Sequence, residues 1–490
     1  MKKIGALILV ICLILSLTAC SGDQKETTVT PSSTAEILYP QFGDMEAVAL
    51  STEHFSLNKG EMVYLYAISV SEFFNDYYDY ISYIGLDPTQ SFKKQKSFFA
   101  TTEEETWFDF FLADATEYAQ DYLLFCEAGL AMGLTLDEED ETFINTQKEL
   151  LEKEAAASGW GIDTYLQQMY STTLEWKYME SALRLTRLAQ KTYTALVGSR
   201  EFTDEEIEAE YQKNKKDYSL VDFYAVDFGD GENIPDEVLE KVRTDLANVS
   251  SLDDFTAVVR DFVAATRTTA AIEDAGGLDK YTTKYLLEGF ASGRSYQNNY
   301  LFNWAFDEET KEGSVYIKEN ESTHAPIAYY LVRGPYRDES VTVDVRHIVF
   351  LTSTYGGSYT TSELAHEAAE KVYQQWLKEG KTVERFISLC AEYSADGNAA
   401  SGGLYTGVEP GEMVTAFNDW CFDETRAVGD HGIVDTEYGS HIMYFEGRNI
   451  TWQKKARTAL SRALYDSVRD AQAEKTPVKV RDEILQSINW

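Results

Sequence analysis

The sequence predicts a multidomain α+β protein in which an all-helical domain precedes two similar α+β modules. Its 490 residues allow about three domains. Between residues 58 and 217, apolar side chains recur every three to four positions, as in amphipathic helices. Two later segments each begin and end with a strand-like run, and they share the strings "NWAFDEET" and "DWCFDET". The tryptophans of these strings, Trp304 and Trp420, are 116 positions apart, which indicates an internal duplication.

The first twenty residues have the features of an export signal. A basic start, "MKK", precedes the apolar run "IGALILVICLILSL", which is short for a membrane span. Small residues then precede Cys20 in "LTAC". This arrangement resembles a bacterial lipoprotein signal peptide, which implies removal of residues 1–19 and lipidation of Cys20, with palmitate among the lipids. An ordinary secretory signal is the alternative. Residues 20–45 form a polar, flexible tether in this interpretation, so the protein is expected on the extracytoplasmic face of the cell membrane.

Charge and cysteine usage limit the possible functions. A net charge of −39, with no Lys/Arg-rich stretch, argues against a nucleic-acid partner. Beyond Cys20, the cysteines are widely spaced in apolar surroundings, and they are Cys126, Cys390 and Cys421. Their spacing fits neither a disulfide framework nor a metal site. We expect buried thiols, no metal and no cofactor.

Residues 46–218 are predicted to form the helical domain, which is dense in tyrosine and phenylalanine. These aromatic residues either form its core or line an open apolar surface that binds other chains, and the sequence leaves both interpretations open. The tail, residues 451–490, has apolar residues at helical spacing and is expected to pack on this domain.

The two modules are predicted at residues 219–340 and 341–449. Each has a first strand, two amphipathic helices, a Gly-Gly-Leu motif, the shared Trp-x-Phe-Asp-Glu string and a last strand. We interpret the tryptophan string as a packing signature: a helix end tucked under the sheet, with its acids in solvent.

The second module contains four segments that suggest an activity. They are "VRHIVF", "YSADGNAASGGL", "PGEMVTAF" and "TEYGSHIMYF", in that order. Together they resemble the parvulin family of peptidyl-prolyl isomerases across the whole module. The resemblance implies an antiparallel sheet wrapped by helices, with a shallow pocket for an X-Pro peptide. The sequence departs from the family at "GGLYTG", which lacks the usual Asp after the glycines, and at Ser440, where an aromatic residue is common.

The resemblance assigns catalytic roles to four residues. His347 and His441 match the two family histidines on adjacent central strands, which are expected to form a hydrogen-bonded pair beneath the twisting carbonyl. Asp396 matches the position that holds Asp or Cys beside the substrate. Thr436 matches a threonine whose hydroxyl, able to donate and accept, joins the histidine network. The alternative interpretation is that these are satisfied core polar groups that only support the sheet.

The residue types suit a reaction that breaks no bond. Rotation about an X-Pro bond has a barrier of about 18–20 kcal/mol, so an enzyme needs no nucleophile or metal for it. It needs an apolar seat for the pyrrolidine ring and a polar environment that prefers the twisted amide. Met413 and Phe417, four positions apart on one predicted helical face, are expected to bind the substrate as this seat.

The first module lacks the histidines. Alignment of the matched strands places Phe223 opposite His347 and Ala328 opposite His441. We therefore expect a degenerate parvulin-like module with a structural or peptide-binding role.

The order of domains resembles secreted foldases of the PrsA/SurA type. This resemblance implies a membrane-anchored enzyme that isomerises X-Pro bonds in newly exported polypeptides, its partners, with chaperone activity from the helical domain. The alternative is a non-catalytic holdase that binds unfolded exported chains.

Overall fold

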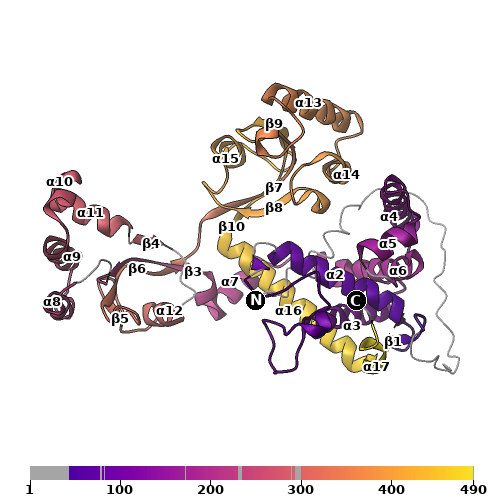
Figure 1. The fold of residues 1–490 in the computed structure, drawn as a ribbon, viewed down its shortest axis with the longest axis horizontal. Coiled ribbons are helices and arrows are strands. Elements are labelled where there is room, and N and C mark those ends of the chain that lie inside the picture. The colour runs from indigo at the N-terminus through magenta and orange to yellow at the C-terminus, as the bar shows by residue number, and fades with distance from the viewer. Residues whose placement is uncertain are drawn as a thin grey trace. The chain divides into compact units, whose positions relative to one another are not determined.

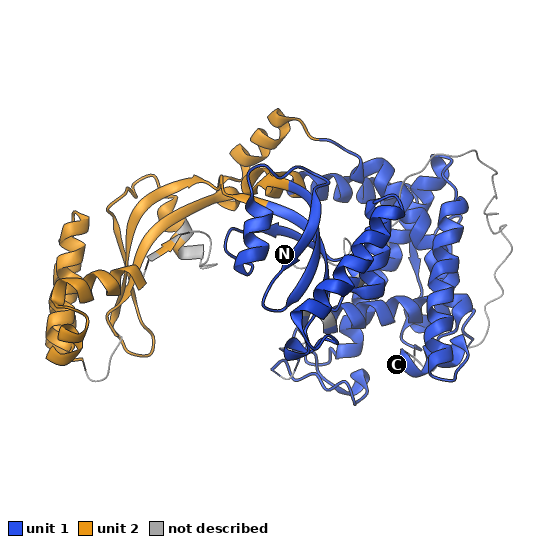
Figure 2. Cartoon of the chain, turned by 90° about the horizontal axis from the view of Figure 1, so that it is seen from above, with its two compact units in different colours: residues 1–201, 343–447, 459–490 blue, residues 202–342, 448–458 orange. Residues whose placement is uncertain are grey.

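The computed structural model describes residues 44–77, 80–81, 83–170, 173–229, 234–288, 290–292 and 299–488. The chain divides into two compact units, which are residues 1–201, 343–447 and 459–490, and residues 202–342 and 448–458 (Figure 2). The predicted signal peptide, Cys20 and nearly all of the predicted tether lie outside the described residues. Among the helices that the structure describes, none has both the length and the hydropathy needed to cross a membrane.

The helical body consists of the described residues of 44–201 and 459–490. Its elements are β1 (Val48–Ser51), β2 (Ser56–Asn58), α2 (Lys59–Tyr77), α3 (Trp107–Ala131), α4 (Glu138–Ala157), α5 (Ile162–Met169), α6 (Trp176–Tyr193), the larger part of α16 (Thr451–Lys475), β11 (Lys479–Val480) and α17 (Asp482–Leu485) (Figure 1). The strands form a small antiparallel sheet in the order β11-β1-β2. This sheet was not predicted from the sequence, because strands of two to four residues are too short to show an alternating pattern.

Aromatic side chains fill the centre of the helical body. The ring of Trp107 on α3 stacks on Phe111 at 5.7 Å and meets Phe73 of α2 edge-on at 5.2 Å. Such offset and edge-to-face pairs add to the free energy gained by burying the rings. The same core contains Tyr465 and Ile488 from the C-terminal segment. Most of the aromatic residues noted in the sequence therefore have a structural role here.

The two α+β modules have the same sheet topology. The first contains β3 (Ser219–Asp227), α8 (Asp236–Leu246), α9 (Leu252–Thr266), α10 (Thr269–Asp274), α11 (Leu278–Glu288), β4 (Phe290–Ser292), α12 (Asn299–Ala305), β5 (Val315–Glu319) and β6 (Pro326–Arg337). The second contains β7 (Val341–Leu351), α13 (Ser362–Lys378), α14 (Val383–Tyr393), β8 (Leu404–Val408), α15 (Thr415–Phe422), β9 (His431–Asp435) and β10 (Gly439–Ile450). Their sheets have the orders β4-β3-β6-β5 and β8-β7-β10-β9. Two sheets with matching strand order are what an internal duplication predicts.

The tryptophan string has the same role in both modules. Trp304 of α12 and Trp420 of α15 are partly buried and pack against one face of the neighbouring sheet. Asp307 and Asp423, which follow these helices, are exposed. The interpretation of the string as a packing signature agrees with the structure.

The Gly-Gly-Leu motifs, in contrast, are not equivalent. Leu278 begins helix α11, whereas Leu404 begins strand β8. A Cβ atom added at Gly277 would meet nothing within 4 Å, but at Gly403 it would lie 2.1 Å from the backbone oxygen of His347. Only in the second module, therefore, does the motif let two strands approach closely.

The compact units also differ from the predicted domain limits at residues 218 and 451. Helix α7 (Asp204–Lys213) and the start of α16 belong with the first module. The guanidinium of Arg337 lies 3.9 Å from the ring centroid of Tyr211 and 4.3 Å from that of Trp452. It also donates a hydrogen bond of 2.8 Å to Glu208. These cation–π and ionic contacts join α7, the end of β6 and the start of α16 into one unit.

Candidate active site

The two central strands of the second module carry the predicted histidines. Successive side chains of a strand point to opposite faces of the sheet. Ile348 and Ile442 pack with α13 and α14 on one face. The neighbouring His347 and His441 lie on the other face, where the ring of Phe417 from α15 contacts both imidazoles. The alternation of β7 and β10 thus places both histidines under α15.

The imidazoles form a direct pair. Nδ1 of His347 lies 3.0 Å from Nδ1 of His441, and the two rings are within 12° of parallel. Both residues are buried, with exposed fractions of 3% and 6%. At this distance one Nδ1 atom must donate its hydrogen while the other accepts it. We call His347 and His441 the imidazole pair.

A carboxylate binds the outer nitrogen of the pair. Oδ2 of Asp396 lies 2.7 Å from Nε2 of His347, and the Tyr405 hydroxyl donates to the same oxygen at 3.1 Å. The backbone N–H of Asn398 donates to Oδ1 at 3.2 Å. Burial by itself raises the pKa of the Asp396 carboxyl, but the hydrogen bond and charge of His347 outweigh it and lower the pKa to about 2. The carboxylate can therefore only accept, and Nε2 of His347 carries a hydrogen.

At the other end, Oγ1 of Thr436 lies 2.9 Å from Nε2 of His441. When His347 is neutral and carries its hydrogen on Nε2, the chain of donors runs one way: Thr436 donates to His441, and His441 donates to His347. The threonine oxygen in turn accepts the N–H of Tyr438 at 3.3 Å. Burial, followed by the charge of His347, lowers the pKa of His441 to about 3, so this imidazole is neutral at neutral pH.

The same atoms also accommodate an added proton. If His347 becomes an imidazolium, it donates to Nδ1 of His441, and Nε2 of His441 then donates to Thr436. The threonine hydroxyl can turn to the carbonyl oxygen of Gly439, 3.3 Å away. Thr436 fits both directions because a hydroxyl donates and accepts. The network is therefore satisfied in two protonation states.

The two apolar site residues lie beside this network. The ring of Phe417 stands at 84° to both imidazoles, 5.5 and 5.6 Å from their centroids, and only 3% of the residue is exposed. Met413 packs against the same cluster and is half-buried. The two residues do not share a helical face as predicted, because Met413 lies in the loop before α15. Phe417 thus forms a floor, and Met413 offers the more accessible surface.

Sequence reasoning missed Tyr405, which stands in the "GGLYTG" segment noted only as a departure. Strand β8 pairs with β7 so that Tyr405 is opposite Val345, two residues before His347. Its ring lies 5.2 Å from the imidazole of His347, and its hydroxyl reaches Asp396. The signal would have been the strand pairing, which the sequence analysis did not assign.

The described residues of the first module show no comparable network. Phe223 is buried against Tyr329, with ring centroids 5.8 Å apart. Ala328 packs with the core beneath α8 and α9, whereas Ile327 lies on the face covered by α12. The alignment of Ala328 with His441 is therefore wrong, because a one-residue shift along a strand exchanges the faces. None of its four strands contains a histidine.

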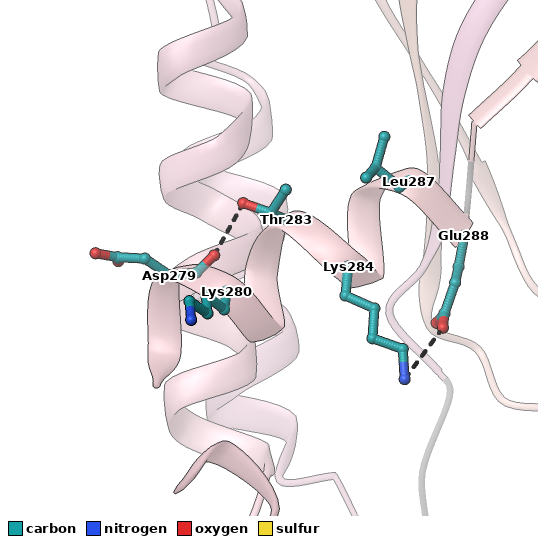
Figure 3. A pocket seen from close by; sticks show the side chains of 6 residues that line it. All are labelled: Asp279, Lys280, Thr283, Lys284, Leu287 and Glu288. Atoms are coloured by element: carbon teal, nitrogen blue, oxygen red, sulfur yellow. Dashed lines mark hydrogen bonds and ion pairs between the residues drawn. The ribbon is translucent and has the colours of Figure 1, made fainter. Parts of the chain in front are cut away.

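Helix α11 of the first module carries a surface pocket of about 560 Å³ (Figure 3). It is lined by Asp279, Lys280, Thr283, Lys284, Leu287 and Glu288. Lys284 pairs with Glu288 at 3.6 Å, one turn along the helix. The lining contains no histidine or cysteine.

Cys126, Cys390 and Cys421 are buried free thiols, as predicted. Burial raises the pKa of Cys390 and of Cys421 to about 12, and it raises that of Cys126 further. Such thiols stay protonated and unreactive at neutral pH. Within the described ranges, no group of three or more His, Cys, Asp or Glu side chains is arranged to hold a metal ion.

Residues 329–448 match the family described as the PPIC-type PPIase domain. This match identifies the second module as a parvulin-type peptidyl-prolyl isomerase domain, the predicted class.

Among solved structures, PrsA from Bacillus subtilis matches 82% of this chain and 100% of its own, with 13% identity and a TM-score of 0.26. Peptidylprolyl isomerase (PrsA) from Bacillus anthracis matches 55% and 95%, with 13% identity and a TM-score of 0.20. Scores this low carry no argument about the whole chain. The sequence matches none of the curated proteins.

Proposed function

We propose that this chain is an extracytoplasmic, membrane-anchored foldase that isomerises X-Pro bonds in exported proteins and also acts as a chaperone. The observation that carries the proposal is the imidazole pair, bonded at 3.0 Å and flanked by Asp396 and Thr436 within a PPIC-type domain. A core network that served only stability would not need an ionised carboxylate at its edge, where 21% of the Asp396 side chain is exposed.

The proposed mechanism uses binding and electrostatics. The pyrrolidine ring binds against Met413 above the buried Phe417, which places the prolyl amide beside Asp396. Conjugation puts partial negative charge on the carbonyl oxygen of a planar amide, and twisting the bond removes it. A fixed carboxylate therefore disfavours the planar amide more than the twisted one, which lowers the barrier. The imidazole pair and Thr436 hold that carboxylate in place and keep the charge compensated.

The test is a cis–trans assay on a proline-containing tetrapeptide with the full-length chain. We expect activity in the wild type and a loss of tenfold or more in His441→Ala and Met413→Ala, the size expected when one transition-state contact of about 1.4 kcal/mol or more is removed. The matched control is His54→Ala, because His54 forms a comparable 2.9 Å bond to Glu127 in the helical body. Absence of activity in the wild type would support the holdase instead.

For the chaperone activity, we assign client binding to an aromatic surface of the helical body. Its residues are Tyr80, Tyr83, Phe98 and Phe99, with exposed fractions of 61%, 80%, 57% and 38%. The rings of Tyr83 and Phe98 lie 6.4 Å apart, and Phe99 continues the group at 5.3 Å from Phe98. A cluster of exposed rings supports binding of apolar segments of unfolded chains.

Suppression of aggregation of a chemically unfolded protein tests this assignment. Tyr83→Ser with Phe98→Ser should reduce suppression, while Trp160→Ser, which removes an exposed ring outside this surface, should not. Equal effects of both changes would contradict the assignment.

The proposed anchor is a lipid on Cys20, supported by the "LTAC" segment. Radiolabelled palmitate fed to a bacterium that expresses the full chain should label the wild type and leave Cys20→Ala unlabelled. Label on both would contradict the anchor.

A further inference from the structure

The carboxylate of Asp396 sits on a segment whose backbone is hydrogen-bonded, through the N–H of Ala395 to the oxygen of Val349 at 3.0 Å, but few side chains hold the carboxylate itself. Asp396 lies between α14 and β8, outside any regular element. Among the described residues, only His347 and Tyr405 bind the Asp396 carboxylate through their side chains. The side-chain amide of the nearby Asn398 is buried and makes no hydrogen bond within the part of the chain that the structure describes. The orientation of the Asp396 carboxylate therefore depends on these two side chains and on the backbone N–H of Asn398.

Tyr405, by contrast, is anchored on a strand. It pairs with Val345 across β8 and β7, and its half-buried ring belongs to the apolar cluster that includes Met413 and Phe417. Its hydroxyl reaches both carboxylate oxygens of Asp396, at 3.1 and 3.4 Å. A rigid donor that faces a carboxylate on a loop is suited to fixing the direction of that carboxylate.

We propose that Tyr405 is a positioning residue for the isomerase: its hydroxyl holds the Asp396 carboxylate toward both His347 and the bound prolyl amide. The inference rests on the role proposed above for Asp396. Burial, followed by the charge of Asp396, raises the pKa of Tyr405 to about 12, so the hydroxyl remains a donor at neutral pH. The carboxylate then receives two side-chain donors from two different strands, β7 and β8.

The change that isolates the hydroxyl is Tyr405→Phe, which keeps the ring beside His347. We expect kcat/KM to fall about three- to tenfold, the range that one ordinary hydrogen bond provides. Tyr373→Phe is the matched control, because Tyr373 of α13 also uses its hydroxyl in a 2.7 Å bond to a histidine, His431, on the other face of the sheet. It should leave kcat/KM unchanged. An equal effect of the two changes would overturn the proposal.

A second background shows whether Tyr405 acts through Asp396. With alanine at position 396, Tyr405→Phe should change kcat/KM less than about 1.5-fold, because the partner of the hydroxyl is gone. An equal loss in both backgrounds would overturn the positioning role. If Asp396→Ala is as active as the wild type, the proposed role of Asp396 itself fails. If it is impaired while Tyr405→Phe is not, only the present inference fails.

If the isomerase activity of Asp396→Ala is too slow to measure, a pH titration of the Asp396 carboxyl tests the proposal without an activity assay. The ¹³C signal of the Asp396 carboxyl, identified by its absence in Asp396→Asn, is followed against pH in the full chain. Tyr405→Phe should raise its midpoint by about 1 pH unit, because one donor to the ionised form is lost. Tyr373→Phe should not move it. An unchanged midpoint in Tyr405→Phe would overturn the proposal.

Discussion

Replacement of Gly403 by alanine is expected to disturb the strand pairing beneath the imidazole pair. Gly403 has a φ of +68°, and an added Cβ would lie 2.1 Å from the oxygen of His347 and 2.8 Å from Sγ of Cys390. The oxygen of Gly403 also accepts the N–H of His347 at 2.9 Å. Strand β8 therefore cannot move away from β7 without losing that bond.

The size of the effect follows from a comparison with Gly380, which follows the end of α13. Gly380 has a φ of +98°, but an added Cβ there would meet nothing within 4 Å. A left-handed alanine costs about 1 kcal/mol at either site. Gly403 adds about 1 kcal/mol for the hydrogen bond and about 1–3 kcal/mol for the overlap. We expect about 3–5 kcal/mol for Gly403→Ala and about 1 kcal/mol for Gly380→Ala.

Hydrogen exchange followed by mass spectrometry measures the local free energy of opening in the full chain. A local measurement is needed because a chain of several domains does not unfold in one step with a single global free energy. Peptides covering residues 341–351 should exchange at least about 30-fold faster in Gly403→Ala than in Gly380→Ala, since each tenfold corresponds to about 1.4 kcal/mol. Isomerase activity should fall only in Gly403→Ala, because β7 carries His347. Equal exchange in the two variants would refute the steric argument.

Three further predictions concern the same module. The pKa of Asp396 is lowered from 3.8 to about 2, which means that the folded state favours the ionised carboxylate. The resulting stabilisation is fully present above pH 3.8 and is lost as the pH falls through about 2. Asp396→Asn should therefore lower the local free energy of opening by about 2 kcal/mol at pH 7, with a smaller difference at pH 3 by hydrogen exchange. Phe417→Ala should cost about 3–5 kcal/mol in the same measurement and reduce peptide binding, because the ring is buried against the imidazoles. A thiol reagent at pH 8 should leave Cys390 and Cys421 unmodified until the protein is unfolded, as read by peptide mass, since burial raises their pKa values.

Much of the candidate site could be predicted because its residues lie in recognisable segments. The resemblance carried by four ordered segments implies that His347 and His441 lie on adjacent strands, and the structure places their Nδ1 atoms 3.0 Å apart. Tyr405 was missed because its contact with Asp396 depends on the pairing of β8 with β7, which no local pattern shows. The alignment of Ala328 with His441 assigned Ala328 to the wrong face of its sheet for a similar reason, since the register of a strand is decided by its partner strand.

The helical body also combines features that the local sequence predicts with features that it does not. The periodicity of the apolar residues predicted its long helices, because each turn of such a helix places an apolar side chain against the core. Its three-stranded sheet was not predicted, since β11 joins β1 from the far end of the chain. Met413 was placed on a helix because its spacing from Phe417 fits one, yet α15 begins at Thr415. Spacing alone does not reveal where a helix begins.

The sequence by itself determined the classes of element and the repeated architecture, and its resemblance to the parvulin family pointed to the histidines, the acid and the threonine. These are local properties: periodicity, turn chemistry and ordered motifs are each contained in a short stretch of chain. The tertiary structure decided which of those groups touch. Hydrogen bonds act over about 3 Å, so the orientation of protons along Thr436, His441, His347 and Asp396 depends on how distant strands are paired. The same pairing adds Tyr405 to the network.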